Sequence, residues 1–144
     1  MSLYHDLIID HYKNPRNFGT LDKPDLVAQE ANASCGDLIE FQIKIKKTKN
    51  KKQKTMINEI AWRGVGCAIS TAGASLLSDK IKSREYGVRK IMEMTDEEMV
   101  EMLGGDISPT RLKCATLSLK ALQKALINSK YEIRNSKQIQ STKF

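Results

Sequence analysis

One stretch of strict alternation sets the strongest constraint on the fold. Between residues 38 and 46, apolar and polar side chains alternate. The apolar positions of this alternation are Ile39, Phe41, Ile43 and Ile45. Successive side chains of a β-strand point to opposite faces of a sheet. The pattern therefore predicts a strand with one buried face and one solvated face.

A second run of the same kind follows after a short basic segment. Residues 56–63 place Met56, Ile60 and Trp62 on one side, and the intervening segment Lys46–Lys54 is rich in lysine. Two strands joined by a polar loop of this length predict an antiparallel hairpin. The basic segment is then the solvated tip of that hairpin.

The remaining segments predict one more strand and several helices. A weaker strand pattern covers residues 25–31, and helical patterns cover residues 3–13, 67–80, 95–103 and the segment after 108. Thr95 and Glu98 form a capping box, and Ser108-Pro109 offers a capping serine with proline at the first helical position. The order predicts an α+β fold of the SufE/NifU-like type, a three-stranded antiparallel sheet with helices packed on one face. We expect a single domain over residues 1–128 and a polar tail over 129–144.

Composition narrows the classes of function. The 144 residues carry a formal net charge of +7, yet the basic segment contains no aromatic residue and no nucleic-acid-binding motif is present. No window of about 18 apolar residues predicts a membrane span, and the N-terminus lacks a signal-peptide pattern. Three cysteines make an odd number that fits no disulfide framework, so we expect a cytoplasmic protein. Neither nucleic acid nor membrane is expected as a partner.

The three cysteines are the candidate functional residues. Cys35 precedes a glycine and lies two residues before Asp37, Cys67 lies where a strand gives way to a helix, and Cys114 follows two nearby cations. Cations and helix N-termini favour a thiolate, and side chains two apart in a strand point the same way. Three thiols and one carboxylate could supply the four ligands of tetrahedral zinc or of a [2Fe–2S] cluster.

A plainer interpretation of these cysteines stays open. A cysteine outside a disulfide is most often a small buried apolar residue, and the sequence contains no Cys-x-x-Cys pair. The histidines His5 and His11 are six residues apart, which does not place them on one helical face as a metal pair. We expect His11 to be structurally bonded or to face a partner. No HExxH, GxSxG or Walker motif supports hydrolase or nucleotide chemistry.

At four places the sequence resembles the U-type iron–sulfur assembly proteins, the family of IscU, SufU and the NifU N-terminal domain. The resemblance covers roughly residues 3–127. It rests on four motifs in the order of the family: Ile9-Asp10-His11-Tyr12-Lys13-Asn14-Pro15-Arg16-Asn17, Ser34-Cys35-Gly36-Asp37, Gly64-Val65-Gly66-Cys67-Ala68-Ile69-Ser70 and Arg111-Leu112-Lys113-Cys114-Ala115-Thr116-Leu117.

The resemblance implies a scaffold on which a [2Fe–2S] cluster is built and then handed on. Its partners would be a cysteine desulfurase that delivers sulfur, an iron donor and recipient apo-proteins. Four residues match the ligand positions of the family, namely Cys35, Asp37, Cys67 and Cys114. Thiolates suit both iron and zinc, so zinc could occupy the same site.

Two departures from the IscU branch keep an alternative open. Lys113 stands where that branch has a histidine, and residues 107–111 replace its chaperone motif, so dependence on a dedicated Hsp70-type chaperone has no support. The Arg-x-Lys-Cys sequence is similar to the SufU branch, whose members hold zinc and relay sulfur. The alternative is a zinc-dependent sulfurtransferase with Cys35 as persulfide acceptor and Lys113 as an assisting residue. A purely structural zinc or interaction domain is the third hypothesis.

Overall fold

A computed structural model describes residues 3–34, 36–47, 55–105 and 107–141. Its side chains are described for residues 6–34, 36–46, 56–105 and 107–127. The predicted tip of the basic hairpin, residues 48–54, lies outside the described residues. Among the described residues, no helix has both the length and the apolar character needed to cross a membrane.

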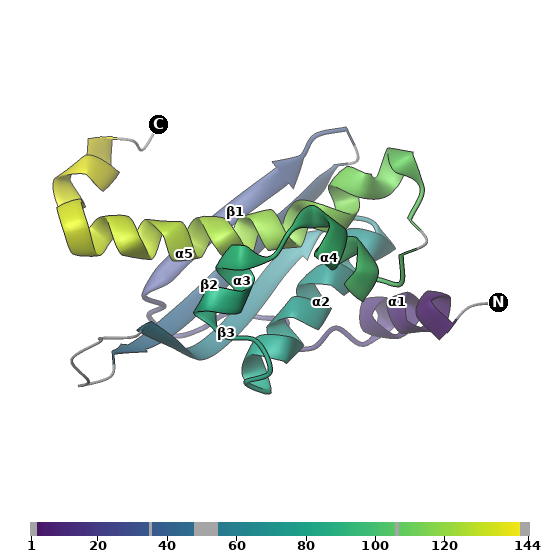
Figure 1. Cartoon of the computed structure of the whole chain (residues 1–144), viewed down its shortest axis with the longest axis horizontal. Helices are drawn as coiled ribbons and strands as arrows, with labels where there is room; N and C mark the ends of the chain where they lie inside the picture. The colour runs from purple at the N-terminus through teal and green to yellow at the C-terminus, as the bar shows by residue number, and fades with distance from the viewer. Residues whose placement is uncertain (1–2, 35, 48–54, 106, 142–144) are drawn as a thin grey trace.

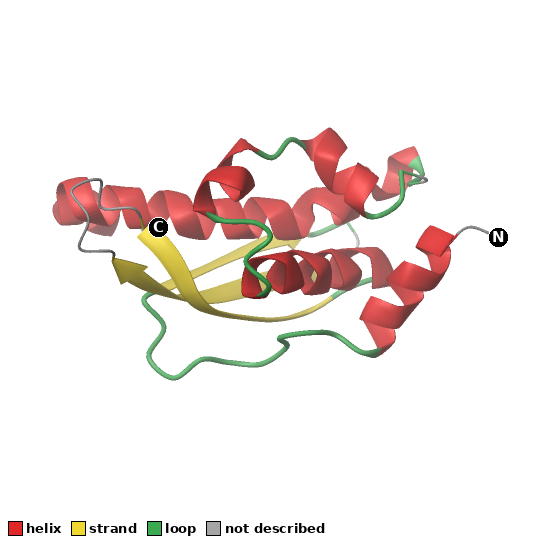
Figure 2. Ribbon diagram, turned by 60° about the horizontal axis from the view of Figure 1, so that its bottom comes forward, coloured by secondary structure: helices red, strands yellow, loops and turns green. Residues whose placement is uncertain are grey.

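The sheet has three antiparallel strands, as the alternation predicts. Their order is β1 (Leu26–Asn32), β2 (Asp37–Lys47) and β3 (Thr55–Val65), with each strand beside its neighbour in sequence. Residues of β2 at positions 39, 41 and 43 are fully buried, which confirms the inner face expected from the period of two. The α+β class with helices on one face is therefore correct (Figure 2).

One bulge changes the inner face of β3. Lys44 pairs with Glu59, but Ile45 pairs with Ile57, so Asn58 is an extra residue on β3. The bulge reverses the alternation, and Met56 is exposed while Ile57 packs against the core. Our placement of Met56 on the same side as Ile60 and Trp62 was therefore wrong. A bulge adds one residue to one strand, and the apolar pattern alone does not reveal it.

Two long helices cover the inner face of the sheet (Figure 1). Helix α5 (Leu112–Ser141) crosses β1 and β2, and α2 (Ala68–Lys82) lies over β3. Helix α1 (Leu3–Lys13) packs on α2, while α3 (Val88–Glu93) and α4 (Asp96–Met102) pack on α5. The buried aliphatic and aromatic side chains between these layers form one core.

The helix boundaries confirm most of the sequence predictions. Thr95 and Glu98 exchange both bonds of the capping box that starts α4. Ser108 makes no capping bond with its side chain, and Pro109–Arg111 form a 3-10 turn before α5 begins. The start of the last helix was therefore placed three residues early. Helix α3 was not predicted, because six residues are too few for a helical period to stand out.

The backbone of α5 stays helical beyond residue 127 and ends at Ser141. The chain after 128 thus continues the last helix, although its polar sequence suggested a tail. The division into a domain over 1–128 and a tail over 129–144 stays a prediction.

Candidate metal centre

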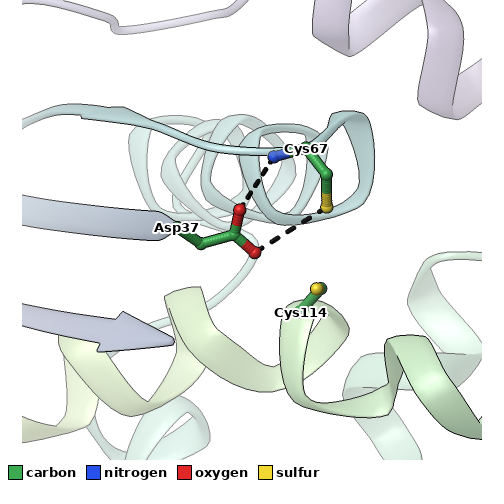
Figure 3. Close-up of side chains that lie close together, drawn as sticks. All are labelled: Asp37, Cys67 and Cys114. Carbon is green, nitrogen blue, oxygen red and sulfur yellow. Dashed lines mark hydrogen bonds between the residues drawn. The ribbon is translucent and has the colours of Figure 1, made fainter. Parts of the chain in front are cut away.

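Three potential ligands that are distant in sequence converge at one end of the sheet (Figure 3). Asp37 is the first residue of β2, Cys67 immediately precedes α2, and Cys114 lies in the first turn of α5. One ligand atom from each lies within 4.8 Å of the others. The fold thus brings together three of the four residues that the sequence singled out.

The carboxylate of Asp37 is fixed by the start of α2. Its Oδ1 accepts a hydrogen bond of 2.9 Å from the backbone N–H of Cys67, and its Oδ2 lies 3.8 Å from the Cys67 Sγ. Asp37 is 2% exposed. Backbone N–H groups at a helix N-terminus carry partial positive charge and stabilise a buried carboxylate. One oxygen is therefore held by the helix, and the other faces the sulfur atoms.

Hydroxyl groups in the first turn of α2 fix the backbone of Cys67. Ser70 and Thr71 both donate to the Cys67 carbonyl, at 3.1 and 3.0 Å. The Ser70 hydroxyl also lies 3.8 Å from the Cys67 Sγ. Gly66 permits this crowding, because a Cβ there would stand 2.7 Å from Oδ1 of Asp37. The Gly66-Cys67 turn is thus built around the carboxylate.

Cys114 closes the group from the opposite layer. It is fully buried, and the side-chain amide of Asn32 donates to its Sγ at 3.7 Å. Burial alone fits the plainer interpretation of a small core residue. The convergence on a carboxylate and a second thiol does not, since a core position needs neither.

One pair of donors is spaced close to the edge of a tetrahedral metal site, and all three ligand atoms lie within 4.8 Å of one another. Zinc binds sulfur at about 2.3 Å and carboxylate oxygen at about 2.0–2.2 Å, so donors on one tetrahedral edge lie roughly 3.5–3.8 Å apart. The Oδ2–Sγ distance of 3.8 Å between Asp37 and Cys67 matches that edge. Two thiols and one oxygen are a donor set that zinc and iron both accept. These three residues could therefore hold a metal.

The described residues do not test the roles of two other predicted site residues. Cys35 lies outside them, so its role stays a prediction. Lys113 is exposed and lines a groove of about 470 Å³ between α4 and α5, together with acidic residues of α4 such as Asp96 and Glu97. Its part in sulfur transfer also stays a prediction.

Sequence reasoning assigned no site role to three residues that support the ligands, although it had noted the glycine beside Cys67. Asn32, Ser70 and Gly66 each touch or crowd a candidate ligand. Ser70 and Gly66 lie within the Gly-x-Gly-Cys-x-x-Ser motif, which was a usable signal. Asn32 ends an ordinary strand and offered none.

The N-terminal motif, residues 9–17, connects α1 to α2 through hydrogen bonds, and we call this contact the α1–α2 joint. His11 is buried, and its Nδ1 lies 2.7 Å from the Ser75 hydroxyl, which also accepts the backbone N–H of Arg16 at 2.9 Å. The Arg16 carbonyl in turn accepts bonds from Trp62 and Ser78. His11 is therefore structurally bonded, one of the two roles we expected for it.

This joint predicts a loss of stability in acid. Burial, aided by the charge of Arg16 and opposed by Asp10 and Asp79, lowers the pKa of His11 below its usual 6.5. The unfolded chain then binds the extra proton first, so the free energy of unfolding falls as the pH drops below about 6.5. Urea unfolding between pH 5 and 8 measures this slope. The variant His11→Asn should show a smaller slope, and an equal slope in both proteins would contradict the prediction.

The fold and the site together define a class. This is a small α+β domain in which one carboxylate and two thiols, each from a different element, form a donor set suited to a thiophilic metal.

Comparison with known proteins places the chain within that class. The family described as "NifU-like N terminal domain" matches residues 3–138, and the chain belongs to this family. The SufU protein of Bacillus subtilis, named a zinc-dependent sulfurtransferase, is 34% identical over 140 residues, covering 87% of this chain and 90% of the relative. The scaffold protein IscU 1 of Archaeoglobus fulgidus is 30% identical, covering 88% of this chain and 76% of its own.

Solved structures agree with the family. A crystal structure described as an iron–sulfur cluster assembly scaffold protein for the SUF system, from Fervidobacterium islandicum, superposes with a TM-score of 0.62 at 25% identity, covering 88% of this chain and 96% of that one. A NifU-like N-terminal protein from Brucella abortus gives 0.63 at 18% identity over 89% and 96% of the two chains, which shows the common fold. The recognised family and the predicted fold are both confirmed.

Proposed function

We propose that this protein is an iron–sulfur cluster assembly scaffold. It builds a [2Fe–2S] cluster from iron and desulfurase-derived sulfur in the cytoplasm and passes it to recipient apo-proteins. The observation that carries the proposal is the convergence of Asp37, Cys67 and Cys114 within 4.8 Å. Relatives named as scaffold proteins, such as those of Archaeoglobus fulgidus and Aquifex aeolicus, support it.

The residues divide the work by their chemistry. We assign Cys35, Cys67 and Cys114 as thiolate ligands and Asp37 as the oxygen ligand of the cargo. Sulfur arrives from the desulfurase as persulfide, and its reduction to sulfide takes two electrons from a thiol or ferredoxin-type donor. The carboxylate is the weakest of the four ligands for a soft metal. Dissociation of the Asp37 carboxylate from the metal would open a coordination position when the cluster leaves.

A zinc-dependent sulfurtransferase is the second candidate. The 34% identity to the protein named SufU and the presence of Lys113 favour it. In this function the thiolate of Cys35 attacks the outer sulfur of the desulfurase persulfide. The sulfur–sulfur bond breaks, the desulfurase thiolate leaves, and Cys35 carries the persulfide, so no net redox change occurs.

Anaerobic reconstitution separates the two functions. The chain is incubated with ferrous iron, L-cysteine, a thiol reductant and a cysteine desulfurase, and UV–visible and Mössbauer spectra are recorded. A [2Fe–2S] spectrum that transfers to apo-ferredoxin supports the scaffold. Retained zinc with no cluster, and faster desulfurase turnover, would overturn it in favour of the sulfurtransferase.

Ligand variants locate the cluster. Cys67→Ser and Cys114→Ser should each lose the spectrum, because serine keeps the size and removes the thiolate. Ser118→Ala is the matched control, since Ser118 is as fully buried on α5 as Cys114. Cluster formation that survives both cysteine changes would show that the cluster is held elsewhere.

Replacing Asp37 should slow the release of the cluster. The variant Asp37→Ala lacks the exchangeable oxygen ligand, and we expect transfer to apo-ferredoxin to slow roughly tenfold, or ~1.4 kcal/mol in the barrier. Asp37→Asn is the useful companion, because its side-chain oxygen can still accept the Cys67 N–H that the carboxylate accepts in the wild type. Faster transfer in either variant would contradict the assigned role.

Replacing Lys113 tests the sulfurtransferase. If Lys113 stabilises an attacking thiolate, Lys113→Ala should reduce persulfide transfer about tenfold without loss of metal. Lys120→Ala, which changes a lysine lining the same groove, is the control. Unchanged transfer, measured with radiolabelled cysteine, would reject this role.

A further inference from the structure

A buried amide faces the third candidate ligand. The Nδ2 of Asn32 lies 3.7 Å from the Sγ of Cys114, within hydrogen-bonding range for a sulfur acceptor. Asn32 is 9% exposed and Cys114 is fully buried. A buried polar group needs a partner to offset its desolvation, and here the sulfur is that partner.

The strand register makes Asn32 the counterpart of Asp37. The two residues are directly opposite one another and form the last pair of the β1–β2 register. Side chains directly opposite in an antiparallel pair lie on the same face of the sheet. Asp37 contacts Cys67, and Asn32 contacts Cys114. The paired residues Asn32 and Asp37 thus each contact a different candidate thiol.

We propose that Asn32 is a positioning residue for the Cys114 thiolate, to which its amide N–H donates a hydrogen bond when the site holds metal. The inference rests on the proposed function, in which Cys114 is a ligand. A thiolate has no proton to donate, so only the N–H edge of the amide can satisfy it. Hydrogen bonds to ligand sulfur tune metal binding and the potential of iron–sulfur clusters. Asn32 orients Cys114 and draws electron density from its sulfur.

Zinc competition and cobalt spectra test this role without any assay of cluster transfer. Zinc affinity is measured against a chromophoric chelator, and Co²⁺ reports the sulfur-to-metal charge-transfer band. The variants are Asn32→Ala and the similarly sized Asn32→Leu, neither of which has a donor. The control is Gln29→Ala, an exposed position on the same strand.

We expect zinc affinity to fall about tenfold in both Asn32 variants, as for other outer-shell partners of a metal ligand. The cobalt band should move to lower energy, because the sulfur regains electron density. Gln29→Ala should match the wild type in both measurements.

The outcomes separate this inference from the proposed function. A wild-type chain that binds neither zinc nor cobalt refutes the metal site itself, and with it the role of Asn32. A wild type that binds both, with an unchanged band and affinity in the variants, overturns the role of Asn32 alone. If Asn32→Ala lowers the thermal stability of the metal-free chain, the cobalt spectrum of Asn32→Leu tests the role instead. A charge-transfer band shifted to lower energy in Asn32→Leu supports the hydrogen bond to Cys114, and a band at the wild-type energy rejects it.

Discussion

Gly64→Ala is expected to lower the free energy of unfolding by about 3 kcal/mol, the upper range for overpacking. Gly64 pairs with Ile39 in the β2–β3 ladder. A Cβ at this position would collide with the carbonyl oxygen of Leu38 and stand 3.1 Å from the Cα of Ile39. Both contacts are with backbone, which cannot rotate away, so the two strands would have to separate.

Urea unfolding of the metal-free chain measures this loss. The control is Gly87→Ala, because a Cβ at Gly87 meets no atom within 4 Å. Alanine also reduces the entropy of the unfolded chain, which adds roughly 0.4–1 kcal/mol of stability at a site without strain. That gain is too small to offset the collision at Gly64. Equal stability of the two variants would contradict the close approach of β2 and β3.

Gly66→Ala should damage the metal centre rather than the sheet. A Cβ on Gly66 would stand 2.5 Å from the Ser70 hydroxyl and 2.7 Å from Oδ1 of Asp37. Both atoms belong to side chains that can turn. The carboxylate would then leave the Cys67 N–H that fixes it. We expect zinc affinity to fall about 100-fold, the upper range for loss of ligand support.

The comparison of Gly64 with Gly66, two residues apart in the sequence, makes this result specific. Gly64→Ala should lose stability in the metal-free state, whereas Gly66→Ala should lose mainly metal affinity. Chelator competition and thermal unfolding of the same samples distinguish them. Wild-type zinc affinity in Gly66→Ala would show that the position of Asp37 does not matter for binding.

The sheet could be predicted because its pattern is local. Alternation at Ile39, Phe41 and Ile43 records burial on one face, and this face is buried in the structure. The exposure of Met56 could not be predicted in the same way. A bulge at Asn58 shifts the register between two strands, and that shift depends on the pairing partner rather than on either sequence alone.

The candidate site was only partly predictable for a similar reason. The settings of Cys67 and Cys114, and the place of Asp37 two residues after Cys35, mark all three as candidates, and the family resemblance assigns them to one site. Nothing in the sequence shows that Asp37 also binds the start of α2, or that Asn32 reaches Cys114. Those contacts arise from the crossing of layers, which no local pattern records.

The placement of the donors along the chain has a consequence for biosynthesis. Asp37 and Cys67 are made early, but the group is completed by Cys114, which comes from the last helix. A nascent chain that has not yet formed α5 lacks Cys114 and so has only part of the proposed donor set. If the site holds metal as proposed, its full donor set exists only after translation has passed into the last helix.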